Sequence, residues 1–333
     1  MRMIDEFSEL KIPKKPFTPK TNSYSLTSDV LSYRRCPRQY HLLQQMKFSP
    51  PTSTQLYFGT IIHQTLDAAH YHFKEKLKET GHGEIPTNAE LFSYFRSVDE
   101  GLYRQDKTPF STGRVRKLTS EHDEKLSSLT YDDLKVEIGI EKASAFVRLR
   151  LFNNLFGDEL YPKVIDTEYR LNITNNEHNI TGVVDVLKYD EDGHVEIWDY
   201  KSYKKSVFDK NNEGQFINPI AKDVVMQMCL YCHMYNIRSG LNPSKAVIVC
   251  IGDLDPKLPE DEQPRDILFS EFDSVSEPSI SAAMYEFEQT IAQIESSEEN
   301  NSWPSGPDAD ENTCAACPIR WSCPNKTYPR RFP

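Results

Sequence analysis

The stretch that decides the fold of this 333-residue chain is Gly182-Val-Val-Asp185 together with Glu196-Ile-Trp-Asp199-Tyr-Lys201. They lie in the stretches over residues 180–189 and 194–202, whose pattern of polar and apolar side chains is typical of β-strands. Asp190-Glu191-Asp192-Gly193, which lies between them, is typical of a tight turn. The sequence therefore predicts a β-hairpin over residues 180–189 and 194–202.

The hairpin brings two carboxylates and a lysine together. Alternate residues of a strand share a face, so Asp199 and Lys201 project together and Asp185, on the preceding strand, reaches the same edge. Paired carboxylates repel each other unless a cation lies between them, and Mg²⁺ or Mn²⁺ prefers such oxygen ligands. The lysine could orient or deprotonate a water, or stabilise a phosphorane-like transition state. Glu168, on the strand before, is a candidate further ligand or water-binding group. A surface ion pair explains Asp-x-Lys alone more simply.

Two positions on predicted helices extend this candidate site. Residues 58–78 carry apolar side chains near helical spacing, and His63, close to the start of that helix, is a candidate metal ligand. Gln227 and Tyr231 are four residues apart on the helix predicted over residues 223–237, where they could contact DNA or orient the lysine. Taken alone, a histidine in such a helix is more often an ordinary core or surface residue, and ordinary packing explains Gln227 and Tyr231 at least as well.

The rest of the chain predicts an α/β core with helical additions. Residues 1–23 are rich in Pro and Lys and are typical of a tail or linker. The β-branched run over residues 245–251 is suited to a buried strand. The remaining expected elements are a strand over residues 164–173 and helices over residues 25–36, 88–103, 132–156 and 279–294. This order favours one α/β domain over residues 24–333.

Three cysteines near the C-terminus have the spacing of a zinc or iron–sulfur site. Cys314-Ala-Ala-Cys317 is followed by Cys323, and each thiol lies near a proline or a tight turn. Cys36, in a basic turn, is the best candidate for the fourth ligand, and it would tie the two ends of the domain together. The other cysteines lie in an apolar helix or a buried strand, where core packing explains them: Cys229, Cys232 and Cys250.

The net charge of −11 does not exclude nucleic acid as a partner, because the acidity is concentrated in one segment. Residues 252–312 hold seventeen acids and two bases, a net charge of −15, which leaves +4 for the rest. We interpret this acidic segment as a solvated surface. Residues 1–50 hold nine bases and four acids. The arginines around Cys36 are candidate DNA contacts: Arg34, Arg35 and Arg38.

Composition excludes several other classes of protein. The 38% hydrophobic and 27% charged residues are typical of a globular chain. The first thirty residues lack the apolar segment of a signal peptide, and no apolar run is long enough to span a bilayer. Seven cysteines, an odd number at low density, argue against a disulfide framework. We expect a cytoplasmic protein in a reducing compartment, without a membrane partner.

In this order, the motifs resemble the PD-(D/E)XK nuclease superfamily, and specifically its RecB-like branch with an iron–sulfur cluster. That branch includes the nuclease domain of AddB, CRISPR adaptation nucleases and exonuclease V. The resemblance covers roughly residues 25–325. The matching motifs are Gly59-x3-His63, Gly182-x2-Asp185, Asp199-x-Lys201, Gln227-x3-Tyr231, and Cys36 with Cys314-x2-Cys317-x5-Cys323.

The resemblance implies a restriction-endonuclease-like core, in which helices flank a mixed central sheet, with a C-terminal cysteine-rich staple over residues 313–325. It implies a Mg²⁺ or Mn²⁺ ion held by His63, Asp185, Asp199 and the Tyr200 backbone carbonyl. It also implies that Lys201 is the catalytic lysine and that the four cysteines bind a [4Fe–4S] cluster. Many relatives have Glu at the position of Asp199, and the superfamily accepts both residues. The helical insertion over residues 81–156 and the acidic segment match no family role.

Our leading hypothesis is a metal-dependent deoxyribonuclease that acts on DNA ends or single strands, in DNA repair, recombination or defence. Relatives in this branch are often fused or bound to a helicase, and the chain has no P-loop motif, so a separate helicase is a candidate partner. One alternative is an iron–sulfur DNA-binding or scaffolding subunit with an idle nuclease site. Another is an RNA-directed nuclease on the same fold, because phosphodiester chemistry alone does not distinguish the sugars.

Overall fold

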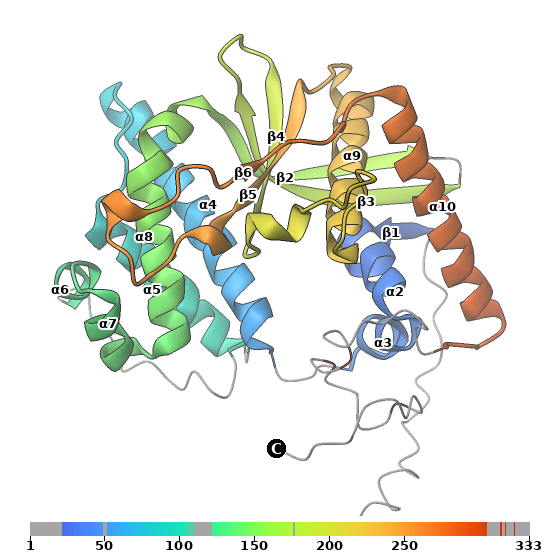
Figure 1. Cartoon of the computed structure of the whole chain (residues 1–333), viewed down its shortest axis with the longest axis horizontal. Coiled ribbons are helices and arrows are strands. Elements are labelled where there is room, and N and C mark those ends of the chain that lie inside the picture. The colour runs from blue at the N-terminus through green and yellow to red at the C-terminus, as the bar shows by residue number, and fades with distance from the viewer. Residues whose placement is uncertain are drawn as a thin grey trace, which may run out of the picture. The chain divides into compact units, whose positions relative to one another are not determined.

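The computed structural model describes most of the chain between the two terminal segments (Figure 1). The described residues are 22–48, 52–105, 107–108, 122–175, 177–304, and Cys314, Cys317 and Cys323. The expected tail falls outside them, apart from its last two residues. The described residues belong to two compact units. We call residues 51–171 and 183–280 the central unit, and residues 1–50, 172–182 and 281–333 the terminal unit.

A mixed β-sheet carries the candidate site residues. In the described chain it has six strands: β1 (Ser23–Ser25), β2 (Val164–Asn175), β3 (His178–Tyr189), β4 (Val195–Lys201), β5 (Lys245–Cys250) and β6 (Leu268–Phe269). The strand order is β1-β3-β4-β5-β6, and β2 pairs with β3. β4 runs antiparallel to β3 and parallel to β5, while β5 and β6 are antiparallel. The expected α/β class is confirmed.

The predicted hairpin is confirmed as β3 and β4, with Val186 opposite Trp198. Its turn forms because the Asp190 carboxylate accepts the backbone N–H groups of Asp192 and His194. Gly193 follows with a φ of 83°, a conformation that glycine adopts at little cost. β5 is almost wholly buried, as its β-branched sequence predicts.

The described part of the central unit also contains α-helices. They are α4 (Thr54–Thr80), α5 (Asn88–Arg104), α6 (Asp123–Ser127), α7 (Tyr131–Ile138), α8 (Ile140–Leu160) and α9 (Pro219–Ser239). Figure 1 shows α4, α5 and α8 together on one side of these strands and α9 on the other. Short 3-10 turns complete this unit: η5 (Tyr161–Lys163), η6 (Lys205–Phe208), η7 (Ile251–Asp253) and η8 (Glu260–Glu262). The main core joins the helices to the strands, with Phe146 and Phe152 of α8 in one cluster with Tyr200 and Val249.

One predicted helix is wrong in its extent. The single helix expected over residues 132–156 is divided into α7 and α8 at Gly139. The backbone of Gly139 has a φ of 90° and a ψ of 160°, which lie outside the helical region. Apolar periodicity continues on both sides of the break, so the pattern concealed it. The sequence also missed α6 and the short strands β1 and β6, because a few residues carry little periodic signal.

The terminal unit is built from both ends of the chain. It contains β1, η1 (Leu26–Leu31), α2 (Ser32–Arg35), α3 (Pro37–Tyr40), η2 (His41–Gln45) and most of α10 (Glu277–Glu299). β1 pairs in parallel with Asn179–Thr181 of β3. The buried Tyr33 hydroxyl is 2.8 Å from Ser297 Oγ and donates to the Gln293 carbonyl, which fixes α2 on α10. The expected helices over residues 25–36 and 279–294 are confirmed.

No helix among the described residues combines the length and the apolar character needed to cross a bilayer.

Candidate functional site

Residues from four elements converge in the central unit. His63 comes from α4, Glu168 from β2 and Asp185 from β3, and ligand atoms of these three side chains all lie within 4.8 Å of one another. Asp199 and Lys201 come from the adjacent strand β4, where their nearest atoms are 2.5 Å apart. The tertiary structure therefore brings together the predicted metal ligands and the predicted catalytic lysine.

Tyr200 contributes its backbone to the same place. Asp185 Oδ2 accepts the Tyr200 N–H at 2.7 Å, and Asp185 Oδ1 is 3.3 Å from His63 Nδ1. His63 Nε2 is 2.8 Å from the Tyr200 carbonyl oxygen. Because a carbonyl oxygen only accepts, His63 Nε2 must be the donor. The imidazole therefore lies between two oxygen acceptors that belong to different strands.

The electrostatics of these acceptors favour a cation. Burial lowers the pKa of His63, but the facing Asp185 carboxylate and the hydrogen bond to it outweigh burial and raise this pKa to about 9. Burial raises the pKa of Asp185, but His63 and Lys201 outweigh it and hold that pKa below its usual range. The imidazolium is thus the positive charge that lets a buried carboxylate stay ionised beside a carbonyl.

Asp199 is the more deeply buried carboxylate, with 2% of its surface exposed. Burial raises its pKa to about 6, the charge of Asp185 adds to this rise, and Lys201 opposes it. The two carboxylates raise the pKa of Lys201 although burial lowers it. Asp199 Oδ2 pairs with the Lys201 ammonium, with an N–O distance of 2.5 Å. A buried carboxylate beside a second carboxylate, with an imidazole and a backbone carbonyl nearby, is a set of donors that fits a hard divalent cation.

Glu168 reaches the site through an unusual backbone conformation. Its φ is 49°, in the left-handed region that non-glycine residues rarely adopt, although it lies within β2. Burial and the nearby Asp185 raise the pKa of its carboxyl group, and His63 opposes them. Backbone strain of this kind gathers at functional sites. The sequence gives no signal for this backbone conformation, because glutamate is not a residue type that marks the left-handed region.

Gln227 and Tyr231 lie together on α9, and both are buried. Gln227 Nε2 donates to the Tyr231 hydroxyl at 2.9 Å. Burial raises the pKa of Tyr231 well above its usual range, and the charges of Asp199 and Asp185 raise it further, so the phenol stays neutral. At such depth neither side chain is exposed to a DNA backbone.

Sequence reasoning missed His70. It lies on α4, two turns after His63, and its Nε2 is 3.0 Å from the Tyr200 hydroxyl. Burial lowers the pKa of His70 to about 3, so the ring is neutral. The seven-residue spacing of the two histidines was the available signal, because it places both on one face of a helix.

The candidate cluster cysteines lie in the terminal unit, and the described ones at the C-terminus are half-buried like Cys36. Gln39 Nε2 donates to Cys317 Sγ at 3.4 Å, and the Arg38 backbone N–H donates to the Pro304 carbonyl at 3.1 Å. The turn around Cys36 therefore contacts the C-terminal segment. The expectation that three cysteines serve the core is confirmed by their burial: Cys229, Cys232 and Cys250.

The three candidate arginines around Cys36 differ in their surroundings. Arg34 forms an ion pair with Glu286 of α10, with an N–O distance of 2.6 Å. Arg35 is exposed, whereas Arg38 is half-buried. Arg34 and Arg35 are thus both exposed and more accessible to a phosphate backbone than Arg38 is.

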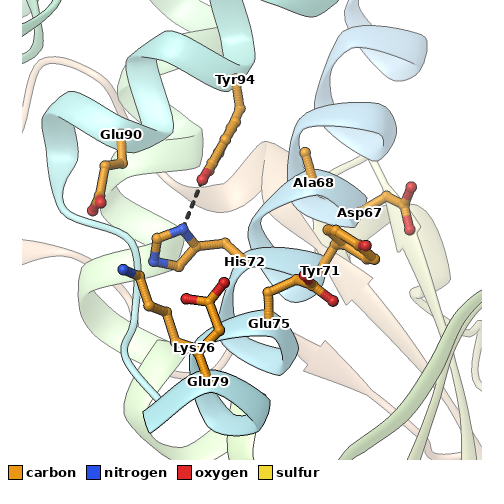
Figure 2. A pocket seen from close by; sticks show the side chains of 9 residues that line it. All are labelled: Asp67, Ala68, Tyr71, His72, Glu75, Lys76, Glu79, Glu90 and Tyr94. Carbon is orange, nitrogen blue, oxygen red and sulfur yellow. Dashed lines mark hydrogen bonds between the residues drawn. The ribbon is translucent and has the colours of Figure 1, made fainter.

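A separate cavity of about 690 Å³ lies between α4 and α5 (Figure 2). Four carboxylates line it, from Asp67, Glu75, Glu79 and Glu90, against one lysine. Figure 2 shows the hydrogen bond, 2.7 Å long, between His72 Nδ1 and the Tyr94 hydroxyl at its side. This acidic lining would repel a phosphate backbone.

Comparisons with known proteins identify the family of the chain. The family model described as the PD-(D/E)XK nuclease superfamily matches residues 27–324. The chain therefore belongs to the PD-(D/E)XK nuclease superfamily. No curated protein matches it significantly.

Seventeen chains of known structure match significantly. One is a protein named "Putative exonuclease" from Eubacterium rectale, with 11% identity, a TM-score of 0.42, and coverage of 94% of this chain and 91% of that one. Another is the protein SSO0001, with 11% identity, a TM-score of 0.35, and coverage of 93% and 90%. The family assignment rests on the family match and on neither of these likenesses.

Proposed function

We propose that this protein is a Mg²⁺- or Mn²⁺-dependent nuclease that hydrolyses DNA phosphodiester bonds. The observation that carries the proposal is the convergence of two carboxylates, an imidazole, a backbone carbonyl and a lysine in one largely buried site. The fold alone would not support a nuclease activity, because one fold can carry many different functions.

In this proposal His63, Asp185, Asp199 and the Tyr200 carbonyl hold the divalent ion, and Glu168 is an additional ligand or binds a water. The ion would polarise the scissile phosphate and lower the pKa of a bound water. Oxygen ligands with one imidazole suit Mg²⁺ or Mn²⁺. The ion would take over the positive charge that the His63 imidazolium supplies in the metal-free protein.

Lys201 is the proposed catalytic lysine. Its ammonium is 2.5 Å from Asp199, so the ion pair fixes the side chain at the carboxylate edge. A cation held in that position stabilises negative charge that grows on the phosphate in the transition state. Gln227 and Tyr231 are proposed to support the carboxylates from α9.

The four half-buried cysteines are proposed to bind a [4Fe–4S] cluster in the terminal unit: Cys36, Cys314, Cys317 and Cys323. The Gln39 contact with Cys317 supports the pairing of the basic turn with the C-terminal trio. Zinc is the competing metal. Anaerobically purified protein with a visible absorbance that disappears in Cys314→Ser would establish iron, whereas colourless protein with stoichiometric zinc would contradict it.

DNA ends or single strands are the proposed substrates, with Arg35 as a candidate backbone contact and a helicase as a candidate partner. The test is incubation with end-labelled single- and double-stranded DNA and with RNA of the same sequence, each with Mg²⁺, Mn²⁺ or EDTA. Metal-dependent loss of DNA with intact RNA is the expected result. Cleavage of RNA alone would show that RNA is the substrate and would contradict the proposed action on DNA.

Lys201→Met is the sharpest variant, and we expect a loss of roughly a hundredfold or more in rate. Lys188→Met is its matched control, because the same hairpin holds a second buried ion pair, with Lys188 Nζ 2.8 Å from Glu196 Oε2. Both variants remove an ammonium that is paired with a carboxylate of the hairpin, and only the first does so at the proposed site. Equal activity in the two variants would contradict the role of Lys201.

A further inference from the structure

Two histidines of α4 hold the two ends of one tyrosine. His63 Nε2 is 2.8 Å from the backbone carbonyl oxygen of Tyr200, and His70 Nε2 is 3.0 Å from its phenolic oxygen. Seven residues are close to two helical turns, so both imidazoles project from one face of α4 toward β4. The tyrosine is therefore held at its main chain and at its side-chain tip by one rigid element.

The side-chain end of this arrangement is buried and closely packed. His70 and Tyr200 are each 2% exposed, and their rings are stacked with an angle of 13° between planes. The Phe152 ring packs edge-on against Tyr200 at 5.5 Å, and the Tyr161 ring packs edge-on against His70 at 4.6 Å. Rings enclosed in this way have one available orientation, and a polar group at such depth is costly to leave without a partner.

We propose that His70 is a positioning residue for the metal centre, which acts by anchoring the Tyr200 phenol so that the carbonyl of the same residue stays beside His63 and Asp185. This inference rests on the proposed function, since it assigns the Tyr200 carbonyl to the metal. The position of a backbone carbonyl depends on what holds the rest of its residue, and the tip of the Tyr200 side chain is held by His70. Partners one step behind a metal ligand typically change metal affinity by 10–100-fold.

The chain offers a matched pair of substitutions. Tyr200→Phe removes only the hydroxyl that His70 contacts and keeps the ring. Tyr161→Phe removes an equally buried hydroxyl, which donates to Asn153 at 2.8 Å, from the other ring packed on His70. Both variants lose one buried hydrogen bond in the same core, but Tyr161 lies outside β4. A general loss of stability would therefore affect both in the same way.

The measurement is Mn²⁺ binding, followed by the electron paramagnetic resonance signal of free Mn²⁺, with thermal unfolding of each variant beside it. We expect Tyr200→Phe to weaken binding roughly tenfold. We expect Tyr161→Phe to bind as the wild type, with a similar fall in melting temperature. His70→Leu should match Tyr200→Phe, and the double variant should be no weaker than either, because both remove one interaction.

The outcomes distinguish a failure of this inference from a failure of the proposed metal-dependent function. Asp185→Asn serves as the variant without a working site. If the wild type binds no more Mn²⁺ than Asp185→Asn does, the metal centre is contradicted and the inference falls with it. If the wild type binds Mn²⁺ and Tyr200→Phe binds equally well, only the positioning role of His70 is overturned. Equal weakening in Tyr200→Phe and Tyr161→Phe would also overturn it, in favour of a purely structural role.

Discussion

At the scale of single residues, backbone geometry is as informative as side-chain chemistry. Glu168 accepts a left-handed conformation within β2, and its carboxylate lies beside His63 and Asp185. Gly252 permits a close approach, because a Cβ there would lie 2.4 Å from the Ser202 carbonyl oxygen. Both features bear on the candidate site, since Ser202 directly follows Lys201.

Glu168→Asn should separate stability from metal binding. Asparagine adopts the left-handed region more readily, so we expect a gain of about 1 kcal/mol in the free energy of unfolding. The same change removes a carboxylate and should weaken Mn²⁺ binding. Glu168→Gln is the control, since it removes the charge without easing the backbone. Chemical denaturation and Mn²⁺ titration check both expectations, and a destabilised Glu168→Asn would contradict the strain.

Gly252→Ala should reduce both stability and nuclease activity. The new methyl group would meet the backbone oxygens of Ser202 and Tyr203, so one segment must shift, at a cost of about 1–3 kcal/mol. Gly101→Ala, in α5, is the matched control. A Cβ there meets nothing within 4 Å, and a gain of about 0.5–1 kcal/mol is expected. Denaturant unfolding measures the stability of each variant, and a nuclease assay measures its activity. If Gly252→Ala changed neither, the backbone around Gly252 would have shifted without cost, and the prediction would be contradicted.

At the scale of elements, α4 organises the central unit. It carries His63 and His70 toward β4, and at its start it joins α5 and α8 through a buried network. Lys142 Nζ of α8 is 2.8 Å from Asp99 Oδ2 of α5, and the Tyr57 hydroxyl of α4 donates to Asp99 Oδ1 at 2.7 Å. Lys142 is only 1% exposed, so this ion pair is fully removed from water.

Lys142→Met should be strongly destabilising, because it leaves the Asp99 carboxylate buried without its cation. Removal of one partner of such a pair costs about 3–5 kcal/mol. The double variant Lys142→Met with Asp99→Leu should recover much of the loss, since it leaves no unpaired charge. Urea unfolding of the single and double variants measures the difference. A double variant no more stable than Lys142→Met would show that the Tyr57 contact matters more than the ion pair.

At the scale of the whole molecule, the chain separates its two candidate metal sites by unit. The divalent-metal residues all belong to the central unit, and the four candidate cluster cysteines all belong to the terminal unit. The cysteines come from positions near both ends of the sequence, so a shared cluster would close a very long loop in the unfolded chain. Such a crosslink stabilises mainly by restricting unfolded conformations.

Cys36→Ser should therefore lose bound iron and unfold at a lower temperature, although the substitution changes one sulfur to oxygen. Cys232→Ala is the matched control, because this cysteine is buried in α9 and was assigned to core packing. Iron content per chain and visible absorbance are the measurements, with thermal unfolding alongside. Iron retained in Cys36→Ser but lost in Cys232→Ala would reverse the assignment of the two cysteines.

Local periodicity explains what could be predicted. Alternation identified β3 and β4, and helical spacing identified α4 and α9, because each depends only on residues a few positions apart. The same patterns joined α7 to α8 across Gly139, since its left-handed φ leaves no periodic trace. Candidate residues could be named wherever chemistry and local spacing coincided, as at Asp199 and Lys201. His70 was not predicted, because its partner, the Tyr200 hydroxyl, is distant in sequence.

The sequence by itself determined the α/β class, the hairpin that carries both carboxylates, and the order of motifs that the superfamily match spans. Only the tertiary structure decided that His63 meets the Tyr200 carbonyl 137 residues away, and that His70 meets the hydroxyl of the same tyrosine. The physical reason is that strand alternation and helix spacing are set by neighbouring residues. The register of α4 against β4 instead depends on packing over the whole core, which no local pattern specifies.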